Sequence, residues 1–219
     1  MKITLLATVA VAALILAAPQ ASAGGYKPYV SVFGGASVLT KNPHGGSTGD
    51  PNYSFDYLMN NPGYIIGGAV GVDWGNQIRT EIELSHARWT SDKYHTSHNT
   101  FDGSSGTNPA STFQSATYLL GNAWYDLGYG SQITPYVGGG LGIGWAHIDQ
   151  GGSYIWDASG LAFQLGAGLR FNVSDHLSID AGYRFKDIVG LNYGASGQYT
   201  ITDTSLASHN FQIGLTYQF

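Results

Sequence analysis

The segment Ala207–Phe219, with the sequence ASHNFQIGLTYQF, decides how this chain folds. Counted back from the end in steps of two, one set of side chains is apolar: Phe219, Tyr217, Leu215, Ile213 and Phe211. The residues between them are polar or small: Gln218, Thr216, Gly214, Gln212 and Asn210. A period of two over this length predicts a β-strand with one apolar and one polar face. Because the strand stops on an aromatic residue, we expect it to close a sheet.

The composition favours alternating strands. Of 219 residues, 32 are Gly and 15 are Tyr, Cys is absent, and 11% are charged, against about 25% in an average soluble domain. The mean hydropathy of -0.06 is too low for a bundle of apolar membrane helices. A net charge of -5 with scattered Lys and Arg offers no basic surface for nucleic acid, so we expect no nucleic-acid binding.

Residues 1–23 have the organisation of a secretory signal peptide. Lys2 supplies the positive start, Ile3–Ala18 is apolar, and Ala21 and Ala23 fit the small positions of a cleavage site after Ala23. The apolar part is shorter than the roughly 20 residues of an ordinary transmembrane helix. We therefore expect a mature chain over residues 24–219, located outside the cytoplasm.

Seven further strand-like stretches precede the last one. The alternation is clear in six of them: Tyr64–Trp74, Ile78–Ser85, Tyr118–Leu127, Ile133–Ala146, Leu161–Phe171 and Leu177–Phe185. In the first stretch, Tyr29–Leu39, two apolar sets compete. Val30, Val32 and Val38 belong to one set, and Phe33 and Leu39 to the other, so the pattern leaves its buried face open.

Short and long connections alternate between these stretches. The short ones are residues 75–77, 128–132 and 172–176, and the long ones are about 40–63, 90–112, 148–160 and 186–206. A transmembrane barrel has short periplasmic turns, longer extracellular loops and an even number of strands. The bulky apolar sets would collide inside an eight-stranded wall but fit against lipid. We predict an all-β fold, an eight-stranded antiparallel up-and-down transmembrane barrel, with a soluble sandwich or lipocalin-like barrel as the alternative.

Four motifs resemble a known family. They are ITPYVGGGLG at 133–142, NAWYD at 122–126, AGYRF at 181–185 and GLTYQF at 214–219. Together they resemble the eight-stranded outer-membrane β-barrel proteins related to opacity-type surface antigens. The resemblance implies a Gram-negative outer membrane, with outer-membrane lipid and lipopolysaccharide as neighbours, and insertion by the barrel-assembly machinery, which recognises the terminal strand with Phe219. It implies no single activity, because the family includes adhesins and immune-evasion proteins.

Charged residues lie on the strand faces that we expect to point into the barrel: Asp73, Arg79, Glu81, Glu83, Asp126, Arg170, Asp180 and Arg184. Buried charges persist only when they are paired and hydrogen-bonded. An eight-stranded interior is just wide enough to be filled by side chains. We expect this interior polar network to plug the lumen, and a narrow or gated ion path is the alternative.

The expected loops are polar and carry aromatic residues: Tyr53, Phe55, Tyr57, Tyr94, Phe101, Tyr154 and Trp156. Aromatic side chains in adaptable polar loops are typical of protein-recognition surfaces, although Tyr and Trp also anchor in the headgroup layer. We predict a non-catalytic, surface-exposed protein with a structural or adhesion role, whose loops are candidates for binding a host or environmental ligand.

Metal chemistry has little support in the sequence. His44, His95 and His98 fall in expected loops, without Cys or a rigid frame for the about three or four ligands that a metal site needs. We predict solvated histidines, no metal site and no cofactor.

A lipid A-modifying hydrolase is the third hypothesis, after the surface protein and the pore. Such an enzyme needs a hydroxyl, a base within hydrogen-bond reach and an acid that orients the base. His95 and Ser97 lie in an expected loop, and the neighbours His86 and Ser85 point to opposite faces of a strand. We therefore predict no enzymatic activity.

Overall fold

In a computed structural model of the chain, the described residues are 25–40, 53–54, 57–96, 98–99, 106–128, 131–150, 154–195 and 199–219. The predicted signal peptide lies outside these residues. The strands are β1 (Lys27–Leu39), β2 (Tyr53–Ser54), β3 (Tyr57–Asn60), β4 (Gly63–Asp73), β5 (Ile78–Thr96), β6 (His98–Asn99), β7 (Gly106–Asp126), β8 (Ile133–Gln150), β9 (Tyr154–Asn172), β10 (Leu177–Ala195) and β11 (Tyr199–Gln218). Within these ranges no helix is long and apolar enough to cross a membrane.

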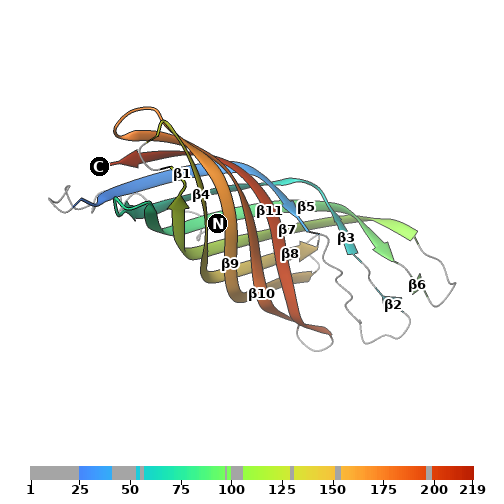
Figure 1. The fold of residues 1–219 in the computed structure, drawn as a ribbon. Coiled ribbons are helices and arrows are strands. Elements are labelled where there is room, and N and C mark those ends of the chain that lie inside the picture. Colours follow the sequence, from blue (N-terminus) through green and yellow to red (C-terminus); the bar gives the residue numbers. More distant parts are fainter. Residues whose placement is uncertain are drawn as a thin grey trace.

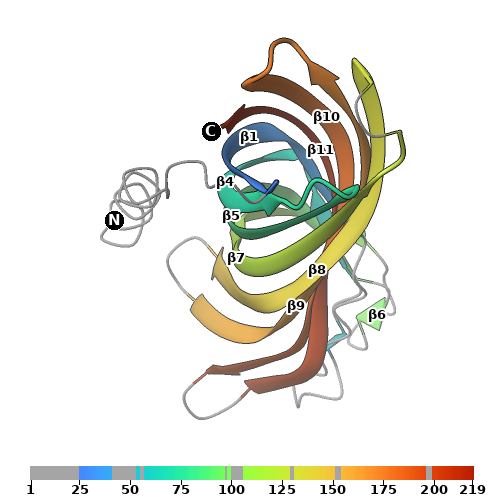
Figure 2. The same ribbon diagram turned by 60° about the vertical axis from the view of Figure 1, so that its left-hand side comes forward.

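Eight of the strands form a closed antiparallel barrel (Figures 1 and 2). The order around the wall is β4, β1, β11, β10, β9, β8, β7 and β5, and β5 pairs with β4 to complete the circle. The first and last strands meet in register, with Val30 opposite Tyr217. The predicted eight-stranded up-and-down barrel is confirmed.

The strands β2, β3 and β6 lie beyond one end of the wall. Strand β3 pairs with β5 and continues the line of β4 after a break at Asn61 and Pro62. The Asn61 backbone N–H still donates to the Thr90 carbonyl oxygen at 2.8 Å, but Pro62 has no N–H to donate. Strands β2 and β6 form a separate two-stranded ladder. We call this end of the barrel the long-hairpin end and the opposite end, where residues 74–77 and 173–176 connect strands, the short-turn end.

The alternation of apolar and polar residues along each strand places the bulky apolar side chains on the outside of the barrel. Ile82, Leu141 and Ile213 are 60%, 65% and 67% exposed, respectively, in the absence of lipid. The first strand follows the same rule, since Val32 is 52% exposed while Tyr29 is buried. Its pairing with both β4 and β11 fixes the face that the sequence pattern left open.

The strands extend farther toward the long-hairpin end than the sequence pattern predicts. Much of the predicted loops is strand: β5 continues to Thr96, β7 begins at Gly106, and β10 and β11 occupy most of residues 186–206. Predicted loop 148–160 reduces to a connection between Gln150 and Tyr154. Residues 41–52 of the first predicted loop lie outside the described ranges. The prediction was wrong here because polar residues on both faces of a strand erase the apolar period that marks it.

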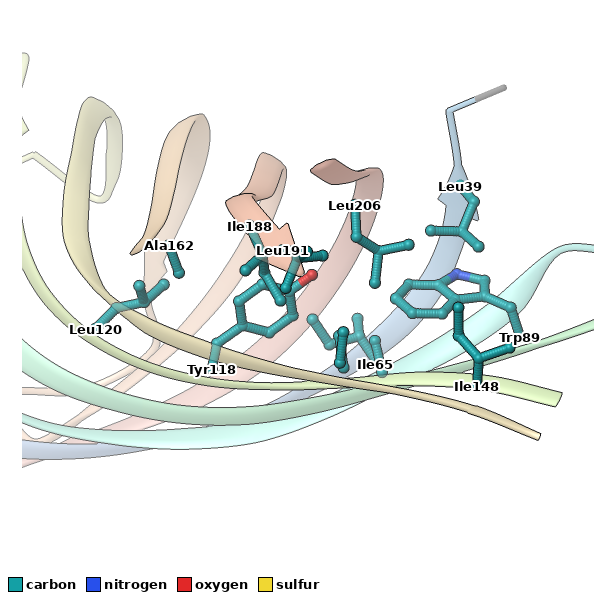
Figure 3. Close-up of a cluster of buried hydrophobic side chains, with 13 residues drawn as sticks. Leu39, Ile65, Trp89, Tyr118, Leu120, Ile148, Ala162, Ile188, Leu191 and Leu206 are labelled. Carbon is teal, nitrogen blue, oxygen red and sulfur yellow. The ribbon is translucent and has the colours of Figure 1, made fainter. Parts of the chain in front are cut away.

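The lumen is filled in two zones. The zone toward the short-turn end holds charged and amide side chains, and the zone toward the long-hairpin end holds an apolar layer (Figure 3). We define the apolar layer by these buried residues: Leu39, Ile65, Ala87, Trp89, Ala116, Tyr118, Leu120, Ala146, Ile148, Ala162, Ile188, Leu191 and Leu206.

Candidate functional site: the filled lumen and the outer wall

Two ion pairs lie in the lumen near the short-turn end. Arg79 on β5 donates from Nε and Nη2 to the two carboxylate oxygens of Asp126 on β7, at 2.8 Å each, and both side chains are buried. Arg170 on β9 donates from Nε to Asp180 Oδ1 on β10 at 3.2 Å. A bidentate pair fixes both partners in one geometry, so these pairs tie together neighbouring strands.

The same zone contains a carboxylate and a guanidinium that aromatic side chains separate. Glu81 accepts hydrogen bonds from Tyr29 Oη at 2.8 Å, Trp124 Nε1 at 2.8 Å and Asn122 Nδ2 at 3.0 Å. The Cζ atom of Arg184 lies 4.1 Å from the Trp124 ring centroid, and Arg184 Nη2 donates to Tyr136 Oη at 3.0 Å. Hydrogen-bond donors therefore compensate the negative charge of Glu81, and the ring of Trp124 and the hydroxyl of Tyr136 compensate the positive charge of Arg184, although the two charged groups do not contact each other.

The centre of the lumen is occupied by Lys186 on β10 and Glu83 on β5. Lys186 Nζ donates to Glu83 Oε1 and also to Ser85 Oγ at 3.1 Å, and the lysine side chain is fully buried. Glu83 Oε2 accepts from Gln164 Nε2 at 2.8 Å and from Asn122 Nδ2 at 3.1 Å. This group links four strands of the wall, β5, β7, β9 and β10.

The apolar layer begins directly beyond this central group. Going two residues farther toward the long-hairpin end, Lys186 is followed by Ile188, Gln164 by Ala162, Ser85 by Ala87 and Asn122 by Leu120. All four of these apolar residues are at most 1% exposed. Ile188 also fills the space beside Gly144, where a Cβ atom would lie 2.5 Å from Ile188 Cδ1. The layer therefore leaves no room for a hydrated ion at this level.

A cavity of about 40 Å³ remains in the polar zone. Its lining includes Arg184, Arg170, Glu81, Gln212 and Gly214. A polar cavity needs about 10–15 Å³ to hold a water molecule, so this one has room for a few waters. Because the apolar layer lies directly beyond Glu83, which lines one end of the cavity, the cavity is a blind recess and not a continuous channel.

The structure places all eight residues of the predicted interior polar network inside the barrel. Asp73 lies at the rim, where it accepts from Gly75 N at 2.9 Å and Gln218 Nε2 at 3.3 Å. Lys186 is the central residue that the sequence reasoning missed, because residues 186–206 were expected to form a loop. The period of two through Asp180, Gly182 and Arg184 continues to Lys186 and would have indicated it.

The predicted loop aromatics fall in several different places. Trp156 is in β9, where it is half-buried and packs against the apolar layer, so its prediction as a loop residue was wrong. The backbones of Tyr53, Tyr57, Tyr94 and Tyr154 are also in strands, while their side chains lie outside the described set. Phe55 and Phe101 lie outside the described residues.

Four histidines of the wall and its short-turn rim make described contacts. Two of them contact hydroxyl groups: His86 Nδ1 lies 2.9 Å from Thr117 Oγ1, and His209 Nδ1 lies 2.7 Å from Tyr183 Oη. His147 Nδ1 lies 2.7 Å from the carboxylate oxygen Oδ1 of Asp157. His176 Nδ1, at the rim, lies 2.9 Å from the Gln218 carbonyl oxygen. These contacts form pairs, and none of them joins a serine, a histidine and an acid as a hydrolase would require. Among described residues, no group of three metal-ligating side chains is present.

A closed antiparallel barrel with an apolar outer wall, short turns at one end and long hairpins at the other is the architecture of an outer-membrane barrel. The comparison with protein families agrees. The chain belongs to the family described as "Outer membrane protein beta-barrel domain", which it matches over residues 7–219. The short-turn end is accordingly the periplasmic end, and the long-hairpin end is the extracellular end.

Individual relatives support the same family. Outer membrane protein PagN of Salmonella typhimurium is 30% identical over 120 residues, which cover 47% of this chain and 49% of PagN, so the match spans about half of each protein. An uncharacterised protein of Brucella abortus is 23% identical over 209 residues, covering 78% of this chain and 73% of that protein. The crystal structure of Neisserial surface protein A has a TM-score of 0.52 at 17% identity and covers 91% of this chain and 100% of that one, which shows a shared fold.

Proposed function

We propose that this protein is a non-catalytic, surface-exposed barrel of the Gram-negative outer membrane, which acts through its extracellular hairpins in adhesion or another recognition role. The sealed lumen is the observation that carries this proposal. A polar network whose remaining cavity has room for only a few water molecules, covered by an apolar layer, offers no path for solutes. The parts of the molecule left to act on the surroundings are the segments beyond the membrane.

The extracellular hairpins are built on continuous strands, which supports a recognition role. The β5–β7 ladder continues to Thr96 opposite Gly106, and the β10–β11 ladder continues to Ala195 opposite Tyr199. The eight residue-to-residue steps from Arg88 to Thr96 correspond to roughly 25 Å of strand length. Loops on a rigid scaffold are the usual location of binding residues, and here the scaffold itself reaches out of the membrane.

The remaining partners in this proposal follow from the location. Cleavage after Ala23 would release the mature chain into the periplasm, and the barrel-assembly machinery would recognise the last strand with Phe219. A host or environmental ligand would bind at the extracellular hairpins, and lipopolysaccharide would surround the outer wall.

A hairpin truncation tests the recognition role. Ser91 pairs with Thr112, so residues 92–111 can be replaced by Asn-Gly, a dipeptide that suits a two-residue hairpin turn. We expect Gram-negative cells displaying the wild-type chain to be retained on mammalian cell monolayers or immobilised extracellular-matrix proteins, and cells displaying the truncation to lose that retention. A matched truncation replaces residues 194–200 beyond the Tyr193–Ile201 pair and shows which hairpin binds. Equal retention of all variants and of cells without the protein would contradict the proposal.

A narrow pore is the second candidate, because the cavity beside Arg184 and Gln212 could hold a few water molecules. A pore would require the apolar layer to open. Steady ion conductance of the purified protein together with unchanged cell retention after hairpin truncation would favour the pore over the recognition protein. A lipid A hydrolase ranks third, and unaltered lipid A acylation on expression, measured by mass spectrometry, would exclude it.

A further inference from the structure

The outer wall changes from apolar to polar along five neighbouring strands. On β4, β5, β7, β8 and β9, one set of direct cross-strand neighbours is apolar: Gly68, Leu84, Leu119, Ile143 and Leu161. Four residues farther toward the extracellular end, the neighbours are Tyr64, Arg88, Ser115, His147 and Asp157. We call this second set the polar row. Tyr64, Arg88 and Asp157 are exposed on the outer face, and His147 is partly exposed there.

The polar row lies at the level expected for the outer-leaflet headgroups. Strand β5 begins at Ile78 near the periplasmic turn, and Arg88 is ten residues farther along it. With about 3.3 Å per residue and a tilt of roughly 40°, that segment rises roughly 25 Å, the height of the apolar band of outer-membrane barrels. Trp145 and Tyr64 lie on the outer face at or next to this level, as interfacial aromatics do.

Arg88 is held against the wall with its charge directed away from the hydrocarbon. Its Cζ atom lies 5.0 Å from the ring centroid of Phe113, which is two residues beyond Ser115 toward the extracellular end. An arginine in this position keeps its methylene groups on apolar surface and its guanidinium in the headgroup region. In the part of the chain that the structure describes, Arg88 takes part in no ion pair.

Positive charge on the outside of the barrel is concentrated near the polar row and the extracellular boundary. Arg79, Arg170, Arg184 and Lys186 lie in the lumen. Of the other described cations, Lys27 lies at the periplasmic end opposite Asp73, whereas Arg88 and Lys93 are exposed on the same strand near the extracellular boundary. Of the cations available to the outer leaflet among the described residues, Arg88 therefore lies in the polar row and Lys93 five residues beyond it on β5.

We propose that Arg88, with the neighbouring Tyr64 and Ser115, binds a phosphate group of the phosphorylated glycolipid in the outer leaflet, that is, a lipid A phosphate. The guanidinium fork matches two phosphate oxygens, and the hydroxyl groups of Tyr64 and Ser115 are donors beside it. The apolar row four residues closer to the periplasmic end, which includes Leu84, Leu119 and Ile143, supplies the surface for acyl chains, which selects a lipid as the source of the phosphate. The site is independent of what the extracellular hairpins bind.

Native mass spectrometry of the full-length barrel tests this site. The barrel is released from bilayer discs that contain lipid A with both phosphates, or the same lipid A after removal of its phosphates. We expect the wild-type protein to retain the phosphorylated form about tenfold better, the effect of about one charge-assisted hydrogen bond. Arg88→Gln should lose most of this preference, and Arg88→Lys should keep part of it because the charge remains.

The control variant is Lys27→Gln, which removes the same charge at the periplasmic end and should leave the preference unchanged. Circular dichroism of each variant confirms that the barrel is folded before binding is compared. Equal retention of phosphorylated and dephosphorylated lipid A by the wild-type protein would overturn the proposal, as would an Arg88→Gln variant that binds like the wild type. Displacement of lipid A by an equal concentration of phosphatidylglycerol would also overturn it, because the site would then prefer a phospholipid.

Discussion

Lys186 on β10 and Glu83 on β5 form a fully enclosed ion pair across the lumen, between strands that are not neighbours in the wall. The pair lies at the boundary between the polar network and the apolar layer, and Ser85, Gln164 and Asn122 complete its hydrogen bonds. It therefore fixes the distance between opposite parts of the barrel.

The first prediction concerns this pair. Lys186→Met alone leaves a buried carboxylate without its cation, and we expect it to lower the free energy of unfolding by about 3–5 kcal/mol. Lys186→Met combined with Glu83→Gln removes both charges and keeps an acceptor for Gln164, so most of the loss should be recovered. Urea unfolding in phospholipid vesicles measures both variants. A double variant as unstable as Lys186→Met alone, or less stable, would show that the two residues do not act as a pair.

The second prediction concerns two glycines of the β7–β8 ladder. A Cβ atom on Gly142 would lie 1.9 Å from the Leu119 carbonyl oxygen, which is backbone and cannot move aside, while a Cβ atom on Gly121 would lie no closer than 3.9 Å to its nearest neighbour. We expect Gly142→Ala to destabilise the barrel by about 1–3 kcal/mol and Gly121→Ala to change its stability by less than about 0.5 kcal/mol. Equal urea midpoints for the two variants would contradict the packing described here.

The sequence predicted the barrel and its two faces because the apolar period of two is strong where strands face lipid. The apolar layer could not be predicted from the sequence, for a physical reason. Ile188, Leu191 and Leu206 lie where the outer face leaves the hydrocarbon and becomes polar, so the period is no longer visible and these residues were assigned to a loop. Ile65 and Leu120 sit among small and polar residues on the inward face, and only the three-dimensional pairing shows that they meet.

The third prediction tests the lipid-facing wall by depth. Leu141 lies near the middle of β8 and Ile133 at its periplasmic start, and both point outward, with exposed fractions of 65% and 50%. Leu141→Arg should destabilise the barrel by about 2–4 kcal/mol, and Ile133→Arg by about 0–1 kcal/mol, because the cost of a charge falls toward the interface. Unfolding in vesicles gives both values. Similar costs at the two positions would contradict the membrane placement of β8.

The fourth prediction separates assembly from stability at the last residue. The Phe219 backbone N–H donates to the Pro28 carbonyl oxygen at 3.0 Å, and its ring lies 5.3 Å from that of Tyr217 at a near-perpendicular angle. If the barrel-assembly machinery recognises Phe219, Phe219→Ala should strongly lower the amount of folded protein in the outer membrane of cells. The same substitution should lower the yield of refolding in vesicles much less. A parallel loss in both assays would assign Phe219 a structural role only.

The most direct test of the sealed lumen is ion conductance in planar bilayers. Ile65 and Ile188 are fully buried in the apolar layer, whereas Ile82 and Ile213 face lipid. The wild-type protein should show no steady conductance, Ile65→Ser with Ile188→Ser should show small reproducible steps as water enters the layer, and Ile82→Ser with Ile213→Ser should remain silent. Stable single-channel steps from the purified wild-type protein would contradict the sealed lumen and, with it, the assignment of function to the extracellular hairpins.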